Sequence, residues 1–458
     1  MTRGAPLPAS ASATQRLGAF AAGVRWADAP EAVRRTALRS LLNGLATALG
    51  SAHDPAVAAA ATALGRFGGA AQATVIGRDE RLDAGAAAFV NAVAMNLLDF
   101  DDTHLPTIIH VTAPVLAPAL AVAEWRGADG AAVLEAFAAG AEIACRIGLA
   151  VTPGHYRRGW HITSTAGCFG AAAATGKLLG LDAEGIAAAL GLASSLTCGH
   201  VENLPTAGKN ASVGSAARSG ILAALLAEAG QRAAPLAIEG PLGWARACGD
   251  EPDRDTIGAG LGDHWEFARN TFKPYPAGIV MHAVIDAALD LRARHRLDPA
   301  AIRTVAVHGD ALLLARGDRV VRNGRDARVS LQHCAAVALA RGRAGPAEFE
   351  AATVFDPEVA ALRERVQAAR DDGLPLGAAR VSVTLDDGRD LAATVAQARG
   401  SLENPLSDAE IEDKLRAAVA AGQGTRGRKT CDPDRVIRSA WGIAEEGGLA
   451  RLLAAVAG

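Results

Sequence analysis

Aromatic side chains are scarce in this sequence: Phe, Trp and Tyr make up only 4% of the 458 residues, although half of the residues are hydrophobic. Alanine dominates the hydrophobic set instead. Alanine has the highest helix propensity and lets helix axes approach closely, so the composition favours closely packed helices. The chain is also longer than one hydrophobic core usually serves, and we therefore expect two domains.

Excess positive charge, a secretory signal and long apolar runs are also missing. The formal net charge is −3, whereas a nucleic-acid surface needs clustered cations that neutralise phosphates. Residues 1–6 lack the continuous apolar core of a signal peptide, and no charge-free run is long enough to span a bilayer. We expect a cytoplasmic protein with neither a nucleic-acid nor a membrane partner.

The six cysteines are scattered and none belongs to a CxxC pair. This spacing argues against a disulfide or zinc framework and fits a reducing cytoplasm. Lysine is also rare, since it supplies only five of the 46 Lys and Arg residues. A lysine retained in such a chain is a candidate for a task that needs its compact, titratable ammonium group. The five are Lys177, Lys209, Lys273, Lys414 and Lys429.

Helical periodicity dominates the first part of the chain. Asp182 is the expected N-cap of one of the helices. Polar loops over 152–161 and 200–210 carry His or Lys between the later helices, and such alternation lets a helical scaffold hold a site in its interior. The predicted helices cover residues 14–24, 30–49, 55–64, 83–98, 114–124, 130–148, 165–179, 182–193 and 215–229.

The pattern changes near residue 265. After a Pro- and Gly-rich linker over 270–278, an Asp-Asp-Gly turn between alternating segments predicts a hairpin. Ser407 and Glu410 form an expected capping box. The predicted elements are a helix over 279–293, a strand over 303–308, a helix over 328–340, the hairpin over 380–395 and a helix over 407–421.

These patterns predict a mainly α protein. A large all-helical domain is built from both chain ends, over residues 1–268 and 401–458. A smaller α+β domain over residues 269–400 is inserted into it.

Ionisable residues concentrate in the stretch 96–110, between segments rich in alanine, valine and leucine. Charged groups among apolar helices are costly unless they are paired or hydrogen-bonded, so this density marks a candidate site. If the helix over 83–98 continues, Asp99 and Thr103 share one face, and Pro106 then ends the helix. The polar residues are Asp99, Asp101, Asp102, Thr103, His104 and His110.

Two plainer interpretations of this stretch stay open. Asp, Thr and Pro are common in caps and turns for local hydrogen-bonding reasons. Asp101, His104 and His110 are also acceptable metal ligands. Their spacing matches neither HExxH nor an EF-hand loop, so we expect no metal.

Further candidates lie outside the stretch. His161 alone is more typical of a structural histidine, and Lys209 lacks the spacing of a phosphate loop. Lys273 and His282 fall near the predicted domain junction, where a cation can close onto an anionic ligand. The motif GxSxG is absent, which argues against covalent hydrolysis by a serine nucleophile. Acid–base chemistry on a small anion remains. In such chemistry, lysines hold carboxylates and histidines move protons.

At these residues the sequence resembles the MmgE/PrpD family, which includes 2-methylcitrate dehydratase, cis-aconitate decarboxylase and iminodisuccinate epimerase. The matching segments occur in family order over essentially the whole chain. They are Asp99-Phe-Asp-Asp-Thr-His-Leu-Pro-Thr-Ile-Ile-His110, Gly159-Trp-His161, Gly208-Lys209, Lys273-Pro-Tyr-Pro, His282 with Ile285-Asp-Ala, and Asn404-Pro-Leu-Ser407.

The resemblance implies a homodimer without cofactor or metal, and an active site between the helical domain and the inserted domain, which serves as a lid. Lys273 is the lysine of the lid motif, and we assign substrate binding to it together with His104 and Tyr275. Asp99 and Thr103 would orient one of the histidines. The residues implicated from the decarboxylase are Asp99, Thr103, His110, His161, Lys209 and His282.

The sequence departs from the family pattern in two ways. The segment from Thr103 to His110 is one residue longer than in the animal decarboxylase. A tyrosine expected in the lid loop is missing, since the only tyrosines are Tyr156 and Tyr275. This counts against cis-aconitate decarboxylation and leaves dehydration or epimerisation more open.

The first hypothesis is therefore a cofactor-independent hydro-lyase that acts on a small di- or tricarboxylate such as a 2-methylcitrate-like acid. Lys209 and Lys273 would anchor carboxylates, and His110 and His161 would be the acid/base pair, in an order that the sequence leaves open. An epimerase or a decarboxylase with the same site is the first alternative. A non-catalytic helical binding protein is the alternative from a different class.

Overall fold

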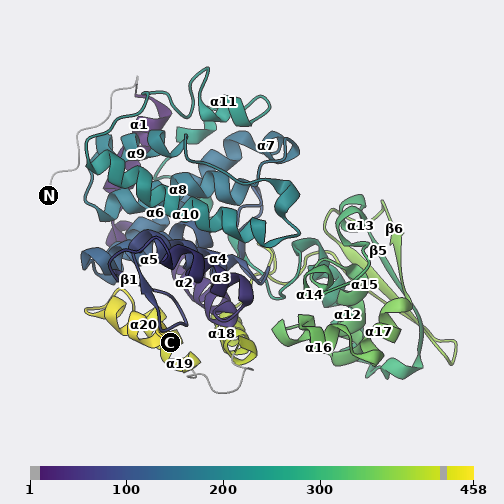
Figure 1. Cartoon of the computed structure of the whole chain (residues 1–458). Coiled ribbons are helices and arrows are strands. Elements are labelled where there is room, and N and C mark those ends of the chain that lie inside the picture. Colours follow the sequence, from purple (N-terminus) through teal and green to yellow (C-terminus); the bar gives the residue numbers. More distant parts are fainter. Residues whose placement is uncertain (1–10, 423–430) are drawn as a thin grey trace. The chain divides into compact units, whose positions relative to one another are not determined.

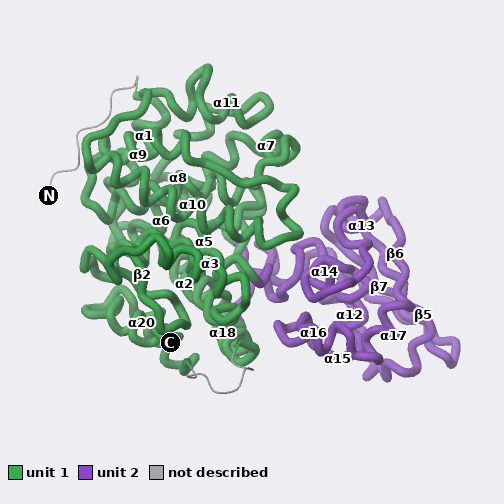
Figure 2. Tube along the Cα trace, viewed as in Figure 1, with its two compact units in different colours: residues 1–97, 101–270, 411–458 green, residues 98–100, 271–410 purple. Residues whose placement is uncertain are grey.

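The computed structural model describes residues 11–422 and 431–458. The chain divides into two compact units (Figure 2): unit 1 contains residues 1–97, 101–270 and 411–458, and unit 2 contains residues 98–100 and 271–410. Helices dominate both units and only unit 2 has a larger sheet, so the expected mainly α class is confirmed. The role of residues 269–400 as a lid stays a prediction.

Long helices build unit 1 (Figure 1), with short strand pairs between them. The helices before residue 270 are α1 (Ala13–Gly23), α2 (Glu31–Ser51), α3 (Pro55–Gly65), α4 (Ala84–Asn96), α5 (Thr112–Arg126), α6 (Gly130–Val151), α7 (Gly154–Arg157), α8 (Ile162–Leu178), α9 (Ala183–Ala193), α10 (Ala207–Glu228) and α11 (Trp244–Cys248). The short strands are β1 (Ala73–Thr74), β2 (Arg81–Leu82), β3 (Asp102–His104) and β4 (Asn270–Phe272). The C-terminal helices are α18 (Asp408–Gly422), α19 (Pro433–Trp441) and α20 (Gly448–Val456).

Small residues let the central helices of unit 1 pack closely. Gly140 in α6 faces Gly170 in α8, and a Cβ atom on either glycine would lie within 2.6 Å of the carbonyl oxygen of the other. A Cβ atom on Gly220 in α10 would lie 2.3 Å from the Cβ of Ala171 in α8. Residues 162–176 of α8 are all buried. The alanine-rich composition therefore has the structural consequence that the sequence predicts, because small side chains allow backbones to approach.

Two predicted helix starts are confirmed. The Asp182 side chain accepts a hydrogen bond of 2.8 Å from the Gly185 N–H at the start of α9. At α18, the Ser407 N–H donates to Glu410 Oε2 at 2.8 Å, and the Glu410 N–H donates to Ser407 Oγ at 3.3 Å. These reciprocal bonds form the expected capping box.

Two predicted boundaries close to the candidate site are wrong. α4 ends at Asn96, Asp99 has a left-handed φ of 51°, and residues 102–104 form strand β3. Asp99 and Thr103 therefore do not share a helix face. α10 begins at Ala207 behind the N-cap Thr206, so Lys209 lies in its first turn and not in a loop.

A four-stranded sheet of order β6-β5-β7-β8 organises unit 2. The predicted hairpin is confirmed as the antiparallel pair β7 and β8, whereas β6, which pairs in parallel with β5, was not predicted. The strands are β5 (Ile302–Gly309), β6 (Val366–Arg370), β7 (Ala379–Leu385) and β8 (Asp390–Val395). The helices are α12 (His282–His295), α13 (Ala311–Gly317), α14 (Gly324–Ala327), α15 (Leu331–Arg341), α16 (Ala351–Val354) and α17 (Pro357–Glu364).

Alternation along β7 explains the core of unit 2. Ala379, Val381, Val383 and Leu385 are buried, whereas the residues between them are partly exposed. The buried side chains join a hydrophobic cluster with apolar residues of α12 and α15. A strand with one buried face and a helical cover is what the period-2 pattern of this segment predicts.

The structure also shows whether membrane-spanning helices or disulfide bonds are present in the described residues. Within residues 11–422 and 431–458, no helix combines the length and the apolar character that crossing a membrane requires. All six cysteines are free thiols.

Candidate active site

The backbone after α4 turns sharply and then doubles back. Asp99 adopts the left-handed conformation, which Asp tolerates better than most residues because its short side chain can hydrogen-bond locally. The His104 N–H then donates to the Ile109 carbonyl oxygen at 2.8 Å, and these two residues form an isolated β-bridge. This reversal brings His110 back against Thr103.

His110 is held by its Nδ1 atom. That nitrogen lies 2.7 Å from the Asp102 carbonyl oxygen and 3.2 Å from Thr103 Oγ1. A carbonyl oxygen only accepts hydrogen bonds, so Nδ1 carries the proton, and the neutral ring has its lone pair on Nε2. The backbone N–H of His110 donates to Thr163 Oγ1 in α8 at 3.1 Å, which ties this residue to the helix that follows His161.

His161 is the N-cap of α8 and only 4% exposed. Its Nδ1 atom lies 3.1 Å from Ser212 Oγ and 3.3 Å from Ser164 Oγ. Each hydroxyl has one hydrogen, and these hydrogens go to the carbonyl oxygens of Lys209 and Cys198, each at 2.7 Å. Both hydroxyls therefore accept from Nδ1–H, and neutral His161 also has its lone pair on Nε2.

Lys209 lies in the first turn of α10 with 6% of its surface exposed. Its carbonyl oxygen accepts from Ser212, whose hydroxyl in turn accepts from His161. The positive end of a 22-residue helix and a buried ammonium group together favour an anion at this place. Hydrogen bonds in unit 1 thus connect Thr103 with His110, and connect His161 with the Lys209 carbonyl through Ser212.

Unit 2 holds the predicted residues Asp99, Lys273, Tyr275 and His282. Lys273, 5% exposed, donates from Nζ to the Asp99 carbonyl oxygen at 3.2 Å. The Tyr275 hydroxyl donates to Asp286 Oδ1 at 2.6 Å, and burial raises the pKa of Tyr275. The ring of Tyr275 meets the ring of His282 edge to face at 5.7 Å. Asp286 thus holds the Tyr275 ring that meets His282.

His104 is completely buried, and both of its ring nitrogens have protein partners. Nδ1 lies 2.8 Å from Thr107 Oγ1, and Nε2 lies 3.3 Å from Glu266 Oε2. Hydrogen bonds from His104 and His264, with Arg269 nearby, hold the pKa of Glu266 at about 2. This geometry favours structural support over substrate contact for His104.

Asp102 is fully buried. Its Oδ2 atom accepts hydrogen bonds from Thr112 at 2.7 Å and from Asn270 at 2.5 Å. Burial nevertheless raises the pKa of Asp102 to about 6, and the neighbouring charge of Asp101 adds to the increase. Because its carboxyl group is bonded to Thr112 and Asn270, Asp102 supports the fold.

The raised pKa of Asp102 predicts how stability depends on pH. The native state binds a proton more tightly than the unfolded chain, so the Asp102 contribution is complete below about pH 4 and is lost as the pH rises through about 6. In Asp102→Asn this component is absent. Relative to this variant, the free energy of unfolding of the wild type should fall by about 3 kcal/mol between about pH 4 and pH 8. Urea titrations at both pH values measure this, and a constant difference would contradict it.

The sequence-based prediction missed two residues that support this arrangement. Asn96 and Asn210 are 0% and 1% exposed, and the Asn210 amide donates to the main-chain and side-chain oxygens of Asn96 at 2.9 and 3.0 Å. An asparagine within an alanine-rich helix is the signal that points to them, because a buried amide needs hydrogen-bond partners.

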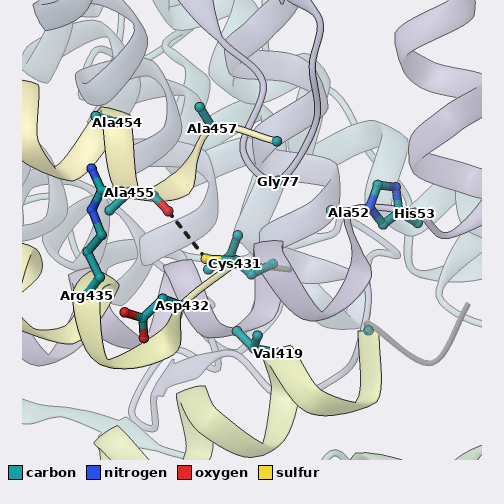
Figure 3. A pocket seen from close by; sticks show the side chains of 13 residues that line it. Ala52, His53, Gly77, Val419, Cys431, Asp432, Arg435, Ala454, Ala455 and Ala457 are labelled. Carbon is teal, nitrogen blue, oxygen red and sulfur yellow. Dashed lines mark hydrogen bonds between the residues drawn. The ribbon is translucent and has the colours of Figure 1, made fainter. Parts of the chain in front are cut away.

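A well-formed cavity lies elsewhere in unit 1. It has a volume of about 430 Å³ and lies beside α19 and α20 (Figure 3), where the Cys431 thiol donates to the Ala455 carbonyl oxygen at 3.3 Å. None of the predicted site residues lines it, so the candidate site rests on side-chain geometry. In the part of the chain that the structure describes, no group of three or more His, Cys, Asp or Glu residues is arranged to hold a metal ion.

Two family models match most of the chain. The model of the MmgE/PrpD N-terminal domain matches residues 15–256, and the model of the MmgE/PrpD C-terminal domain matches residues 275–431. The cis-aconitate decarboxylase of Homo sapiens is 29% identical over 357 residues, which are 74% of this chain and 73% of the relative. The cis-aconitate decarboxylase of Aspergillus terreus is 27% identical over 446 residues and 90% of each chain. The protein of that name from Mus musculus is 29% identical over 366 residues, which are 75% of this chain and 74% of the relative.

Proposed function

Because the chain belongs to the MmgE/PrpD family, we propose that it is a cofactor-independent lyase that acts by proton transfer on a small di- or tricarboxylic acid. The decarboxylase relatives support an enzyme of this family. The observation that carries the proposal is the geometry of His110 and His161 in unit 1. Each ring donates from Nδ1–H to a protein acceptor, so each neutral ring has its lone pair on Nε2, as a proton acceptor requires.

The proposed chemistry assigns a task to each group. One imidazole removes a proton from the carbon next to a carboxylate, and the other protonates the departing hydroxyl group. The negative charge that develops on the substrate carboxylate needs fixed positive charge nearby. Lys209, in the first turn of α10, supplies an ammonium group at the positive end of a helix. Lys273 would bind a second carboxylate, and Asp99, Thr103 and His282 would complete the site.

Dehydration is the first choice among the family reactions. The tyrosine expected in the lid loop is absent, since Tyr156 and Tyr275 are the only tyrosines and residues 317–328 contain none. Decarboxylation is the second choice, favoured by the names of the relatives. Epimerisation uses the same site with reprotonation on the opposite face. Homodimeric assembly and a cytoplasmic location stay predictions.

Product analysis tests this proposal. The purified protein is incubated with 2-methylcitrate, citrate and cis-aconitate in the presence of EDTA, and products are followed by proton NMR. We expect a new vinylic proton signal from citrate or a new methyl signal on a carbon–carbon double bond from 2-methylcitrate, and no loss of activity on chelation. Release of CO₂ from cis-aconitate as the only reaction would replace dehydration by decarboxylation. Loss of activity with EDTA, restored by a divalent ion, would contradict the metal-free mechanism.

A further inference from the structure

A path of buried polar side chains leads from the start of α10 to His110. Asn210 donates from Nδ2 to Asn96 Oδ1 at 3.0 Å, and Asn96 donates from Nδ2 to Asp101 Oδ2 at 2.5 Å. The same Oδ2 atom lies 3.6 Å from His110 Nδ1. The path therefore joins the helix that carries Lys209 to one of the two candidate proton carriers.

The orientation of each amide in this path is determined. The Asp101 carboxylate only accepts hydrogen bonds, so Asn96 must present its NH₂ group to it. Asn96 then presents Oδ1 to Asn210, which matches the bond from Asn210 Nδ2. Asp101 is 2% exposed, and in such a place a charge is weakly screened by water. The two asparagines thus fix a carboxylate group beside His110.

The Nδ1 atom of His161 meets a different environment. Its partners there are the neutral hydroxyls of Ser212 and Ser164. His161 also caps the N-terminus of α8, where the helix dipole disfavours a cation. Titratable groups on neighbouring elements include His155 in α7, His200 on the loop that pairs with Trp160, and Lys209 in α10. The Asp101 carboxylate therefore stabilises a second proton on His110, at Nε2, and the N-terminus of α8 disfavours one on His161.

We propose that Asp101, held by Asn96 and Asn210, is the charged positioning residue of His110, so that His110 is the proton donor and His161 the proton acceptor of the reaction. The inference rests on the proposed function for these two roles. The pairing of Asp101 with His110 can be measured without any turnover. In one cycle neutral His161 takes the proton from the substrate carbon on Nε2, and His110, which enters as the imidazolium, gives its Nε2 proton to the departing hydroxyl group, which leaves as water. His161 then releases its proton to solvent and His110 takes one up, so both rings return to their starting states.

Asp102 provides the natural comparison for Asp101. The two carboxyl groups are adjacent and both are buried, but Asp102 is committed to Thr112 and Asn270. Burial raises the pKa of Asp102 to about 6, and the charge of Asp101 contributes to this increase. Of the two carboxyl groups, Asp101 is thus the one whose carboxyl oxygen lies beside His110.

The experiment follows the ring of His110 by NMR across a pH titration, with His110→Gln to assign its resonance. In Asp101→Asn the midpoint of this titration should fall by about one to three pH units, because an opposite charge at this distance stabilises the imidazolium by that much. Asp102→Asn should move the midpoint much less. An unchanged midpoint in Asp101→Asn, or an equal shift in both variants, would overturn the pairing.

Two further measurements test which histidine donates the proton and which accepts it. In the wild type, His110 should keep its proton to higher pH than His161, and Asp101→Asn should lower kcat at least tenfold with little change in KM. The reverse order of the two titrations would overturn the assignment of donor and acceptor. If no carboxylate is turned over, the proposed function fails, but the titration still decides whether Asp101 pairs with His110.

A second variant covers the case in which Asp101→Asn does not fold. Asn96→Ala keeps the carboxylate but removes the hydrogen-bond donor that holds it beside His110. The midpoint of the His110 titration should then fall, by less than in Asp101→Asn. Asn91→Ala is the matched control: Asn91 lies in the same helix, is 2% exposed and bonds to the main chain of Ile76 and Thr74. A shift of equal size in the control, or none in Asn96→Ala, would overturn the pairing.

Discussion

His161→Ala is expected to lower kcat by about 10²–10⁴-fold, the usual contribution of a positioned general base. The ring is buried and its Nδ1 atom is fixed by Ser212 and Ser164, so the lone pair on Nε2 has a defined direction. Alanine removes the proton acceptor but none of the proposed carboxylate anchors. KM should therefore change little. Initial rates with the carboxylate that the wild type converts, measured by proton NMR, give both constants.

A matched control separates this effect from a general disturbance of the loop. His200 is exposed, lies on the loop that pairs with Trp160, and stacks on that ring at 5.2 Å. His200→Ala should keep activity within about threefold of the wild type, since surface substitutions usually have small effects. Thermal unfolding of both variants checks that each is folded. A folded His161→Ala protein with wild-type kcat would exclude His161 from the chemistry.

Glu142→Ala should destabilise the protein by about 3–5 kcal/mol, because it leaves a buried guanidinium group without its counter-ion. Glu142 and Arg146 are 0% and 3% exposed, one turn apart in α6. Glu142 also accepts from the Phe267 N–H at 2.8 Å, and Arg146 donates to the carbonyl oxygens of Ala259, Gly260 and His264. The pair thus anchors the segment that brings Glu266 to His104.

An exposed ion pair serves as the control for this buried pair. Arg126 and Glu228 lie 3.1 Å apart, and each side chain is 36% exposed. Glu228→Ala should therefore cost less than about 1 kcal/mol. Urea denaturation gives both values. The double variant Glu142→Met with Arg146→Met should be more stable than Glu142→Ala, because it removes the isolated charge. Equal costs for Glu142→Ala and Glu228→Ala would show that the buried pair does not anchor the fold.

Local sequence signals predicted the elements that depend on neighbouring residues. Asp182 and the pair Ser407 and Glu410 cap helices as expected, because cap hydrogen bonds join residues two or three positions apart. The hairpin of β7 and β8 follows from alternation around an Asp-Asp-Gly turn. In contrast, β6 was missed because its Ala- and Gln-containing sequence has little strand propensity and is stabilised by its partner β5.

The details of the candidate site depend on distant contacts, so the sequence alone did not predict them. Helical periodicity cannot reveal that Asp99 turns left-handed directly after α4. The proton positions on His110 and His161 follow from carbonyl and hydroxyl partners that the structure identifies. Asn96 and Asn210 are 114 positions apart in the chain, and only the packing of α4 against α10 brings them together.

The central claim is that this protein moves a proton at the carbon next to a substrate carboxylate. The direct measurement is deuterium incorporation into 2-methylcitrate-like acids in D₂O with EDTA, followed by NMR for the wild type, His161→Ala and Lys209→Ala. We predict exchange or turnover with the wild type that is lost in both variants. Saturable binding without exchange or turnover across a broad panel of carboxylates would contradict the claim and favour a binding protein.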